Sequence, residues 1–478
     1  MLKTWKGMKN MKKWICLIMA MILTLSLCAC GESGGKSVKG LQAGFGRVMI
    51  IPDYTVQLAG GAATRMSDGY QDALSMTFVA LRENEETYLL CTMDVICAED
   101  VFVDPSKAAI AEATGVPEEN ILMNATHTHA SVAIRSNGSE NVERYREEFF
   151  GWAVECAQEA IADLSPATVS YTATQAEGMA YVRHYALDNG TYAGSNFGSF
   201  SSGTIVGHST DADTQMQLIK FARAAEDKKD IVLMNFPAHA TMTQSNTTLS
   251  ADFPAPFREY VEENADVLCA YFIAAAGDQV PGSKLVEETF STDYRVYGEE
   301  LGRIAVEAMN TMTDMEGSGI AMSTKTFTAG YNKEKLDMLA EAEQVKLVWD
   351  IEGRASDKGK AAAKEHGFAS VYEVSAVLNR ANAPDTNSMV IKALRLGNVS
   401  FIFAPYEMFG TQGMAIKENS PYPMTFIITC AEGAEGYLPS VKGWEIGSYE
   451  SHVTKFERGS AEKLAEEFVS MLTELNQN

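Results

Sequence analysis

The sequence predicts an α/β fold, in which a mixed sheet forms the core and helices cover it. Two observations lead to this class. Apolar, β-branched runs alternate with stretches of helical periodicity along the chain, and several of these runs are apolar at every position. A strand that is apolar on both faces must be buried on both sides, which a half-solvated antiparallel meander does not provide.

The apolar runs predict strands over residues 47–51, 74–81, 87–96, 120–124, 216–221 and 231–236. The helical periodicity predicts helices over residues 105–114, 142–164, 253–264, 294–312, 332–348, 372–381 and 460–475. Gly115 followed by Pro117 ends the first of these helices, because Gly stops a helix and Pro prevents its continuation. Residues 350–387, rich in Ala, Lys, Glu and Ser, suggest a helical insertion over the core.

Residues 1–30 have the pattern of a bacterial lipoprotein signal peptide. Residues 1–13 carry five lysines and no acid, and the apolar run 14–27 is shorter than the roughly 20 residues that span a membrane. The run ends in Leu27-Cys28-Ala29-Cys30, which resembles a lipobox. We therefore expect Cys30 to be lipidated and residues 31–40 to tether a body, residues 41–478, to the outer side of the cell membrane. A simple cleaved signal is the alternative.

The composition excludes several partners. The chain has 39 Lys and Arg against 63 Asp and Glu, a formal charge of -24, with no basic patch. An acidic surface repels phosphate backbones and anionic lipids, so we expect no nucleic-acid partner and membrane contact through the lipid anchor only. The five cysteines after residue 40 form no CxxC pair, which favours buried thiols over a disulfide framework or a cysteine metal site.

The histidines mark the most informative segments. An apolar strand runs into His127 and His129, and in an extended chain a spacing of two points both imidazoles the same way. Such a pair can bind a metal or divide ligation and proton transfer, although hydrogen-bonded surface histidines are the simpler alternative. His239 follows a second apolar strand. Because ligand sites in α/β sheets gather at the carboxyl ends of strands, the two strand ends favour one shared site.

Glu407 is the acidic candidate for the same site. It follows the apolar strand that begins at Phe401 and lies within an apolar turn. Carboxylates are seldom buried unless they are paired or bound to a metal, so Glu407 requires a cation. The alternative is an acid at a helix N-terminus, stabilised by the helix dipole.

Seven short segments, taken in order, resemble the neutral (non-lysosomal) ceramidase family over about residues 41–455. The most specific is Ala125-Thr126-His127-Thr128-His129. The segments are residues 43–48, 58–60, 124–129, 235–239, 275–278, 405–409 and 436–439.

This resemblance implies an enzyme that hydrolyses a linear amide, a ceramide or another N-acyl amide, with water activated by one zinc ion and no organic cofactor. It implies that His127, His239, Glu407 and Tyr437 hold the zinc. His129 and Tyr449 correspond to residues that stabilise the transition state, and protonated His129 is suited to give a proton to the leaving amine. Arg183 corresponds to an arginine on the substrate side.

The sequence also departs from the family. Val280 replaces a serine once proposed as a nucleophile, which excludes a serine mechanism at that position, and Ala130 alters the loop beside the histidines. We expect no C-terminal immunoglobulin-like domain. Asp252 and Asp278 either orient ligand imidazoles or cap the following helix or turn.

Three other functions remain open at this point. The same metal site could hydrolyse an ester, a phosphoester or a cyclic amide, given the altered loops at Ala130 and Val280. The chain could be a non-enzymatic surface lipoprotein that binds a solute. It could also retain the fold without turnover, although all four ligand types are present.

Overall fold

The computed structural model describes residues 40–61, 63–135, 139–194, 203–285 and 289–477. The expected signal peptide, Cys30 and nearly all of the expected tether lie outside the described residues. Within the described ranges, no helix is both long enough and apolar enough to cross a membrane.

The larger sheet has nine strands in the order β14-β13-β12-β7-β1-β4-β5-β6, with β16 paired to β7. Two pairs, β5–β6 and β13–β14, are parallel, and the other pairs along this order are antiparallel. The strands are β1 Gln42–Met49, β4 Ser75–Glu83, β5 Glu86–Met93, β6 Ile121–Ala125, β7 Ser165–Gln175, β12 Gln215–Arg223, β13 Asp230–Phe236, β14 Val267–Ile273 and β16 Thr313–Asp314.

A smaller sheet has the order β17-β18-β19-β21. Its strands are β17 Ile320–Gly330, β18 Thr386–Leu396, β19 Val399–Phe403 and β21 Met424–Ile428. The short strands of the other sheets are β2 Gln57–Leu58, β3 Arg65–Met66, β8 Tyr181–Val182, β9 His184–Leu187, β10 Tyr192–Gly194, β11 Ile205–His208, β15 Gln279–Val280, β20 Glu407–Met408 and β22 Tyr437–Leu438.

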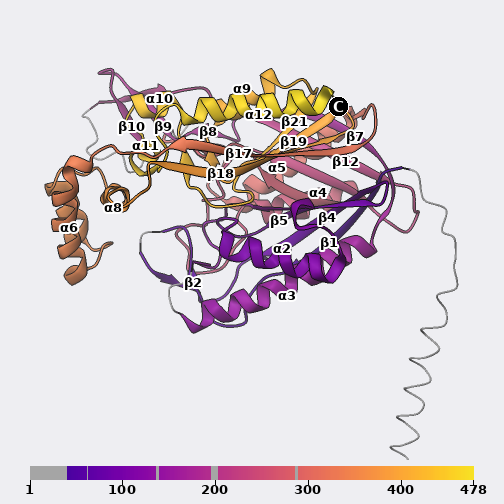
Figure 1. The fold of residues 1–478 in the computed structure, drawn as a ribbon, viewed down its shortest axis with the longest axis horizontal. Coiled ribbons are helices and arrows are strands. Elements are labelled where there is room, and N and C mark those ends of the chain that lie inside the picture. The colour runs from indigo at the N-terminus through magenta and orange to yellow at the C-terminus, as the bar shows by residue number, and fades with distance from the viewer. Residues whose placement is uncertain (1–39, 62, 136–138, 195–202, 286–288, 478) are drawn as a thin grey trace, which may run out of the picture. The chain divides into compact units, whose positions relative to one another are not determined.

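The helices are α2 Asp100–Thr114, α3 Glu140–Ala162, α4 Pro254–Ala265, α5 Tyr294–Ala308, α6 Leu339–Glu352, α7 Asp357–Glu365, α8 Val371–Arg380, α9 Gly410–Asn419, α10 Val441–Glu445, α11 Tyr449–Val453 and α12 Ser460–Gln477, with short 3₁₀ turns at Glu118–Asn120, Met309–Thr311 and Leu336–Met338. Helices α2, α3, α4, α5, α9 and α12 cover the two outer faces of the paired sheets (Figure 1). Helices α6, α7 and α8 instead pack on one another around an apolar core of their own.

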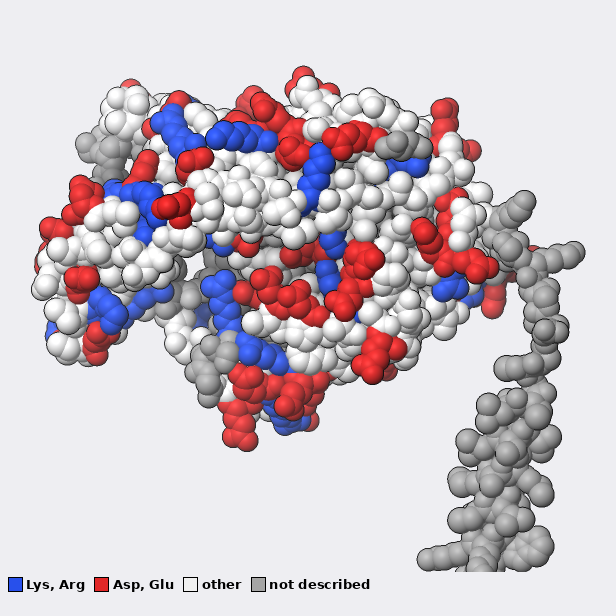
Figure 2. All heavy atoms as spheres, viewed as in Figure 1, with Lys and Arg blue, Asp and Glu red and all other residues white. Residues whose placement is uncertain are grey.

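Apolar side chains pack between these layers and form three cores. One lies between the larger sheet and α2, α3, α4 and α5, a second lies between the two sheets, and a third lies between the smaller sheet and α9 and α12. The predicted α/β class, with a mixed sheet covered by helices, is therefore confirmed. Acidic and basic side chains are interspersed over the face seen in Figure 2, without one continuous basic surface.

Most predicted elements agree with the structure within a few residues, but the helix predicted over residues 332–348 begins only at Leu339, after a 3₁₀ turn. The first helix begins at Asp100 and accommodates Pro105 in its second turn, but it ends as predicted, with Gly115 in the left-handed region at φ 75°. Strands β7 and β17 were not predicted, because their half-exposed sequences lack a continuous apolar run. Helices α7 and α8 both lie within residues 350–387, and β18 begins at Thr386.

Residues 429–432 connect the two edges of the larger sheet. On one side, Thr429 donates from its amide to Ile273 at the end of β14, at 3.2 Å. On the other side, the Ala125 amide of β6 donates to Cys430 at 3.0 Å, and the Glu432 amide donates to Met123 at 2.9 Å. This segment therefore holds the ends of β6 and β14, distant in strand order, beside each other.

Two glycines of β1 allow α3 to lie directly on the strand. A Cβ atom on Gly44 would lie 2.1 Å from the Ala160 carbonyl oxygen, and one on Gly46 would lie 2.3 Å from the Cys156 carbonyl oxygen. The contacting atoms are backbone, which cannot move aside as a flexible side chain can.

We expect Gly46→Ala to lower the free energy of unfolding by about 1–3 kcal/mol, because the added methyl group pushes α3 away from the sheet. Urea unfolding followed by circular dichroism measures the change. Gly151→Ala is the matched control, since Gly151 is exposed on α3 and a Cβ atom there meets nothing within 4 Å. The control substitution should raise the free energy of unfolding by about 0.5–1 kcal/mol, because alanine favours the helix more than glycine does. Equal effects of the two substitutions would contradict the close packing.

Candidate metal centre

Three histidines and one carboxylate converge where β6 and β13 end. The Nε2 atoms of His127 and His129 are 3.2 Å apart. Oε2 of Glu407 lies 3.3 Å from Nε2 of His127 and 3.1 Å from Nε2 of His239. The ligand atoms of the three histidines all lie within 4.8 Å of one another, a grouping that could hold a metal ion.

The two histidines of the HxH segment meet for a different reason from the one predicted. Strand β6 ends at Ala125, and His127 is not extended but left-handed, with φ 65°. Its amide donates to Val95 at 3.1 Å, whereas the His129 amide donates to Ala240 at 3.1 Å. The prediction that both rings share one side of an extended strand is therefore wrong in its cause, although the rings do converge. A non-glycine residue in this region is strained, and such strain is typical of functional sites.

Backbone carbonyls fix the orientation of all three rings. Nδ1 of His127 lies 2.6 Å from the Ile96 oxygen, and Nδ1 of His129 lies 3.2 Å from the Gly60 oxygen. Nδ1 of His239 contacts the Ala276 oxygen. Because a carbonyl only accepts, each Nδ1 carries the hydrogen, which leaves an electron pair on each Nε2 of a neutral ring. Electron pairs at this separation repel one another unless a proton or a metal ion lies among them.

Two glycines from the predicted motifs allow this arrangement. Gly60 has φ 85°, and a Cβ atom there would lie 2.5 Å from Cβ of His129. A Cβ atom on Gly277 would lie 2.6 Å from the Glu407 carbonyl oxygen. The Gly277 amide also donates to Met408 at 2.7 Å. These glycines let the chain pass directly behind a histidine and behind the carboxylate.

Strand pairing places Tyr437 beside Glu407. Strands β20 and β22 are parallel, and Glu407 is the register partner of Tyr437. Glu407 is only 9% exposed, although it is a carboxylate. The four residues predicted as zinc ligands therefore lie in one neighbourhood, and their role as ligands stays a prediction.

The pKa values follow from burial and from the charges that face one another. Burial lowers the pKa of His127, but the Glu407 carboxylate together with the neighbouring Cys430 and Cys97 sulfur atoms raises that pKa well above its ordinary value. Burial lowers the pKa of His239 to about 4, and burial together with the other two imidazoles lowers the pKa of His129 well below its ordinary value. Burial raises the pKa of Glu407, yet His127 and His239 outweigh it and hold that pKa well below its usual range. The site therefore favours an ionised carboxylate facing one positive charge.

A second polar cluster adjoins the first. Glu450 is fully buried and accepts from Nε of Arg183 at 2.8 Å, while Oε2 lies 2.9 Å from Nε2 of His184. The Arg183 guanidinium lies 5.4 Å from the ring centre of Tyr437. The rings of Tyr437 and Tyr449 meet edge to face with centres 5.7 Å apart. Arg183 and Tyr449 thus lie beside the predicted ligands, and their catalytic roles stay predictions.

Asp252 and Asp278 do not orient the imidazoles. Asp252 accepts from the Thr243 amide at 2.6 Å and from the Phe253 amide at 2.8 Å, next to the start of α4. Asp278 accepts from the Gly410 amide at 2.8 Å, at the start of α9. Burial raises the pKa of each to about 6. Asp252 therefore binds the start of the helix that follows it, the second role considered from the sequence, whereas Asp278 binds the start of the distant helix α9, which neither role included.

Sequence reasoning missed several residues around the histidines. Sγ of Cys430 lies 3.6 Å from Nδ1 of His127. Glu450 and His184 also went unassigned, although each directly follows a predicted site residue. The Ile96, Gly60 and Ala276 carbonyls could not be found from side-chain patterns, because a backbone group has no sequence signature.

The fold and the site define a class: a mixed α/β protein with a buried histidine–carboxylate cluster at strand ends that could hold a metal ion. No protein-family model matches the chain, and no curated protein matches it by sequence.

Solved structures do match. One, titled a ceramidase complexed with C2, has a TM-score of 0.66 at 15% identity and covers 92% of this chain and 76% of that chain. The neutral ceramidase from Pseudomonas aeruginosa has a TM-score of 0.66 at 16% identity and covers 92% of this chain and 75% of that chain. The chain has the fold of neutral ceramidase, which confirms the sequence resemblance at the level of the fold.

We expect Glu450→Gln to lower the free energy of unfolding by about 3–5 kcal/mol at pH 7, because it leaves the Arg183 charge buried without its partner. His184 and Arg183 outweigh burial and hold the pKa of Glu450 below its ordinary 4.5. The carboxylate therefore stabilises the fold fully above about pH 4.5, and this stabilisation declines as the pH falls below that value. Urea unfolding at pH 7 and pH 3.5 should show a smaller difference between the two proteins at pH 3.5.

Glu445→Gln is the control for this experiment. Glu445 and Arg458 form an exposed pair at 3.1 Å. Loss of this ion pair should lower the free energy of unfolding by less than about 1 kcal/mol at pH 7. A similar loss in both variants would contradict a special role for the buried cluster.

Proposed function

We propose that this protein is a zinc-dependent hydrolase of linear amides, with a ceramide or another N-acyl amide as substrate. The observation that carries the proposal is the convergence of His127, His239 and Glu407, with the Nδ1 atom of each imidazole committed to a backbone carbonyl. The fold shared with neutral ceramidases supports the amide class.

The donor set suits zinc. Two donor atoms at about 2.0–2.2 Å from a tetrahedral zinc ion are roughly 3.3–3.6 Å apart. The atoms of His127 and Glu407 are 3.3 Å apart, and those of His239 and Glu407 are 3.1 Å apart. Neutral imidazole and carboxylate are also ligands that zinc prefers. His127, His239, Glu407 and Tyr437 would hold the ion.

When bound, zinc supplies Lewis acidity, which lowers the pKa of water and polarises a carbonyl. The protein's own residues then carry the remaining steps. His129, the more exposed of the two HxH histidines, is a neutral ring with an electron pair on Nε2, so it would first take a proton from the attacking water and then give that proton to the leaving nitrogen of the amide. The Tyr449 hydroxyl would donate a hydrogen bond to the oxygen on which negative charge develops. Arg183, held by Glu450 and stacked near Tyr437, would help to position the substrate.

We also propose that the protein acts outside the cytoplasm and is anchored through a lipid on Cys30. The lysine-rich start, the short apolar run and the lipobox-like sequence that ends at Cys30 support this. An anchor of this kind would keep the catalytic domain beside a membrane, where lipid amides are found.

Metal removal tests the proposal. The purified full-length protein should contain about one zinc per chain and should hydrolyse a fluorogenic N-acyl amide, and a chelator should abolish turnover until zinc is restored. Glu407→Gln and His239→Ala should lose both zinc and activity, because each removes a donor. Elemental analysis and the fluorogenic assay measure the two quantities.

His366→Ala is the matched control, since His366 lies at the end of α7 and is none of the clustered residues. It should keep both metal and activity. A folded protein without metal, or one whose turnover survives the loss of zinc, would overturn the proposed mechanism. Parallel assays with ester, phosphoester and cyclic amide substrates would identify a different scissile bond.

The proposed division of roles gives a second test. We expect His129→Gln and Tyr449→Phe to retain zinc and to lower kcat by roughly 10²–10³-fold, because they remove a proton donor and an oxyanion donor. Steady-state kinetics and metal analysis of the same samples check this. Tyr372→Phe is the control, because Tyr372 packs against Tyr449 with ring centres 5.6 Å apart and the substitution keeps the ring. Loss of zinc from His129→Gln would instead make His129 a ligand.

A further inference from the structure

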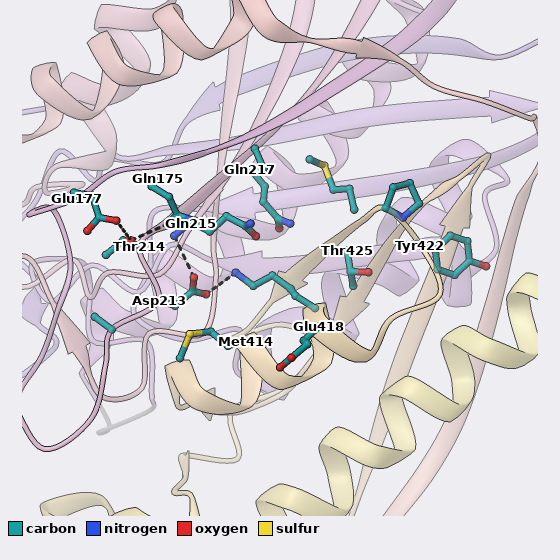
Figure 3. Close-up of a pocket in the computed structure, with 15 residues that line it drawn as sticks. Gln175, Glu177, Asp213, Thr214, Gln215, Gln217, Met414, Glu418, Tyr422 and Thr425 are labelled. Atoms are coloured by element: carbon teal, nitrogen blue, oxygen red, sulfur yellow. Dashed lines mark hydrogen bonds and ion pairs between the residues drawn. The ribbon is translucent and has the colours of Figure 1, made fainter.

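A polar groove lies apart from the histidine centre. Its volume is about 680 Å³, and it lies between strands β7 and β12, helix α9 and residues 421–425 (Figure 3). Its lining includes none of the clustered histidines, nor Glu407, Tyr437 or Tyr449. The groove is therefore a separate candidate for ligand binding.

The floor of the groove is made of side-chain amides. Gln215 and Gln175 are register partners, and Gln217 follows Gln215 on the same face of β12. Gln217 lies opposite Ala173, whose small side chain leaves room above the amide. Figure 3 shows the amide ends of Gln215 and Gln217 extending into the same space.

These amides interrupt an apolar pattern. Farther along the same face of β12, Ile219 and Phe221 belong to the core between the two sheets. The alternation of the strand would therefore place apolar residues at positions 217 and 215 if the core simply continued. The change to carboxamides marks the point where this face is used for polar contacts.

One of the amides lacks a partner. Gln217 is only 4% exposed, and its Oε1 atom has no hydrogen-bond partner among the described residues. A buried acceptor without a donor is unfavourable, so it calls for a hydrogen from outside the protein. A ligand hydroxyl in the groove would supply that hydrogen.

The charges of the groove exclude an anion. Lys417 is paired with Asp213 at 2.7 Å, which leaves the exposed carboxylates Glu177 and Glu418 on the lining without a compensating base. A phosphate or a carboxylate would be repelled by this surface.

A neutral, hydroxyl-rich ligand fits the groove instead. A hydroxyl both donates and accepts, and so does a carboxamide. Met414 and Pro423 add apolar surface to the lining, against which the C–H face of a sugar ring can pack. We propose that this groove binds a neutral carbohydrate.

The groove and the histidine centre are close but separated by Gln279. Its side-chain Oε1 accepts from the Asp213 amide at 2.7 Å, and its backbone oxygen accepts from the His239 amide at 3.1 Å. Replacement of groove amides should therefore leave the metal donors unchanged. Carbohydrate binding can be tested whether or not the proposed hydrolase activity is correct.

The test uses the full-length protein and methyl glycosides of glucose, galactose, mannose and N-acetylglucosamine. Saturation-transfer NMR and calorimetry should detect binding of at least one glycoside. Gln217→Leu should weaken that binding about tenfold or more, because it removes the unpaired acceptor but keeps a similar volume. Gln175→Ala, at an exposed position, provides a second variant that should weaken binding even if Gln217→Leu fails to fold.

Gln158→Leu is the matched control, because Gln158 is exposed on α3 and does not line the groove. It should bind the glycoside as the unaltered protein does. Absence of binding by all four glycosides, or equal affinity in the groove variants and the control, would overturn the proposal. So would saturation of the groove by calcium or inorganic phosphate in place of any glycoside.

Discussion

The charge balance around Glu407 governs the centre of this protein. A carboxylate that is 9% exposed is strongly unfavourable unless positive charge faces it. Here the facing atoms are Nε2 of His127 and of His239, and the Nδ1 atoms of both rings are committed to backbone carbonyls. The carboxylate and the rings can satisfy one another only through a shared cation, a proton or a metal ion. The surrounding backbone holds these groups close together, despite the repulsion between neutral imidazoles.

The scaffold that holds these groups together depends on residues 429–432. This segment bonds to the end of β6 and to the end of β14, the parallel neighbour of β13, at opposite ends of the strand order. Two buried asparagines reinforce the junction. The Asn124 amide donates to the Thr429 oxygen at 2.5 Å, and the Asn235 amide donates to the Ile427 oxygen at 3.0 Å. Each asparagine precedes a site histidine by three or four residues, so the segments that carry the histidines are bonded to β21 and to the residue that directly follows it.

The short motifs that pointed to a family also have physical explanations. Gly60 and Gly277 are glycines because a Cβ atom would collide with His129 or with the Glu407 backbone. Gly46 is a glycine because α3 lies against it. Asp278 sits beside Gly277 to hold the start of α9, the helix that follows Glu407 by three residues. Each motif is a weak signal by itself, because it reflects a single close contact. Taken in order the motifs are informative, because most of these contacts surround one site.

The sequence by itself determined the alternation of strands and helices and the end of α2 at Gly115, because burial and periodicity are local properties. It also marked His127, His129, His239 and Glu407 as candidates at strand ends, whereas Tyr437, Tyr449 and Arg183 followed only from the resemblance to a family. It could not determine the left-handed turn at His127, the carbonyls that fix the imidazole tautomers, or the pairing of Glu450 with Arg183 and His184. Those features arise from contacts between residues tens to hundreds of positions apart. The polar groove likewise appeared only in three dimensions, because strand register and the packing of α9 decide which glutamines share a space.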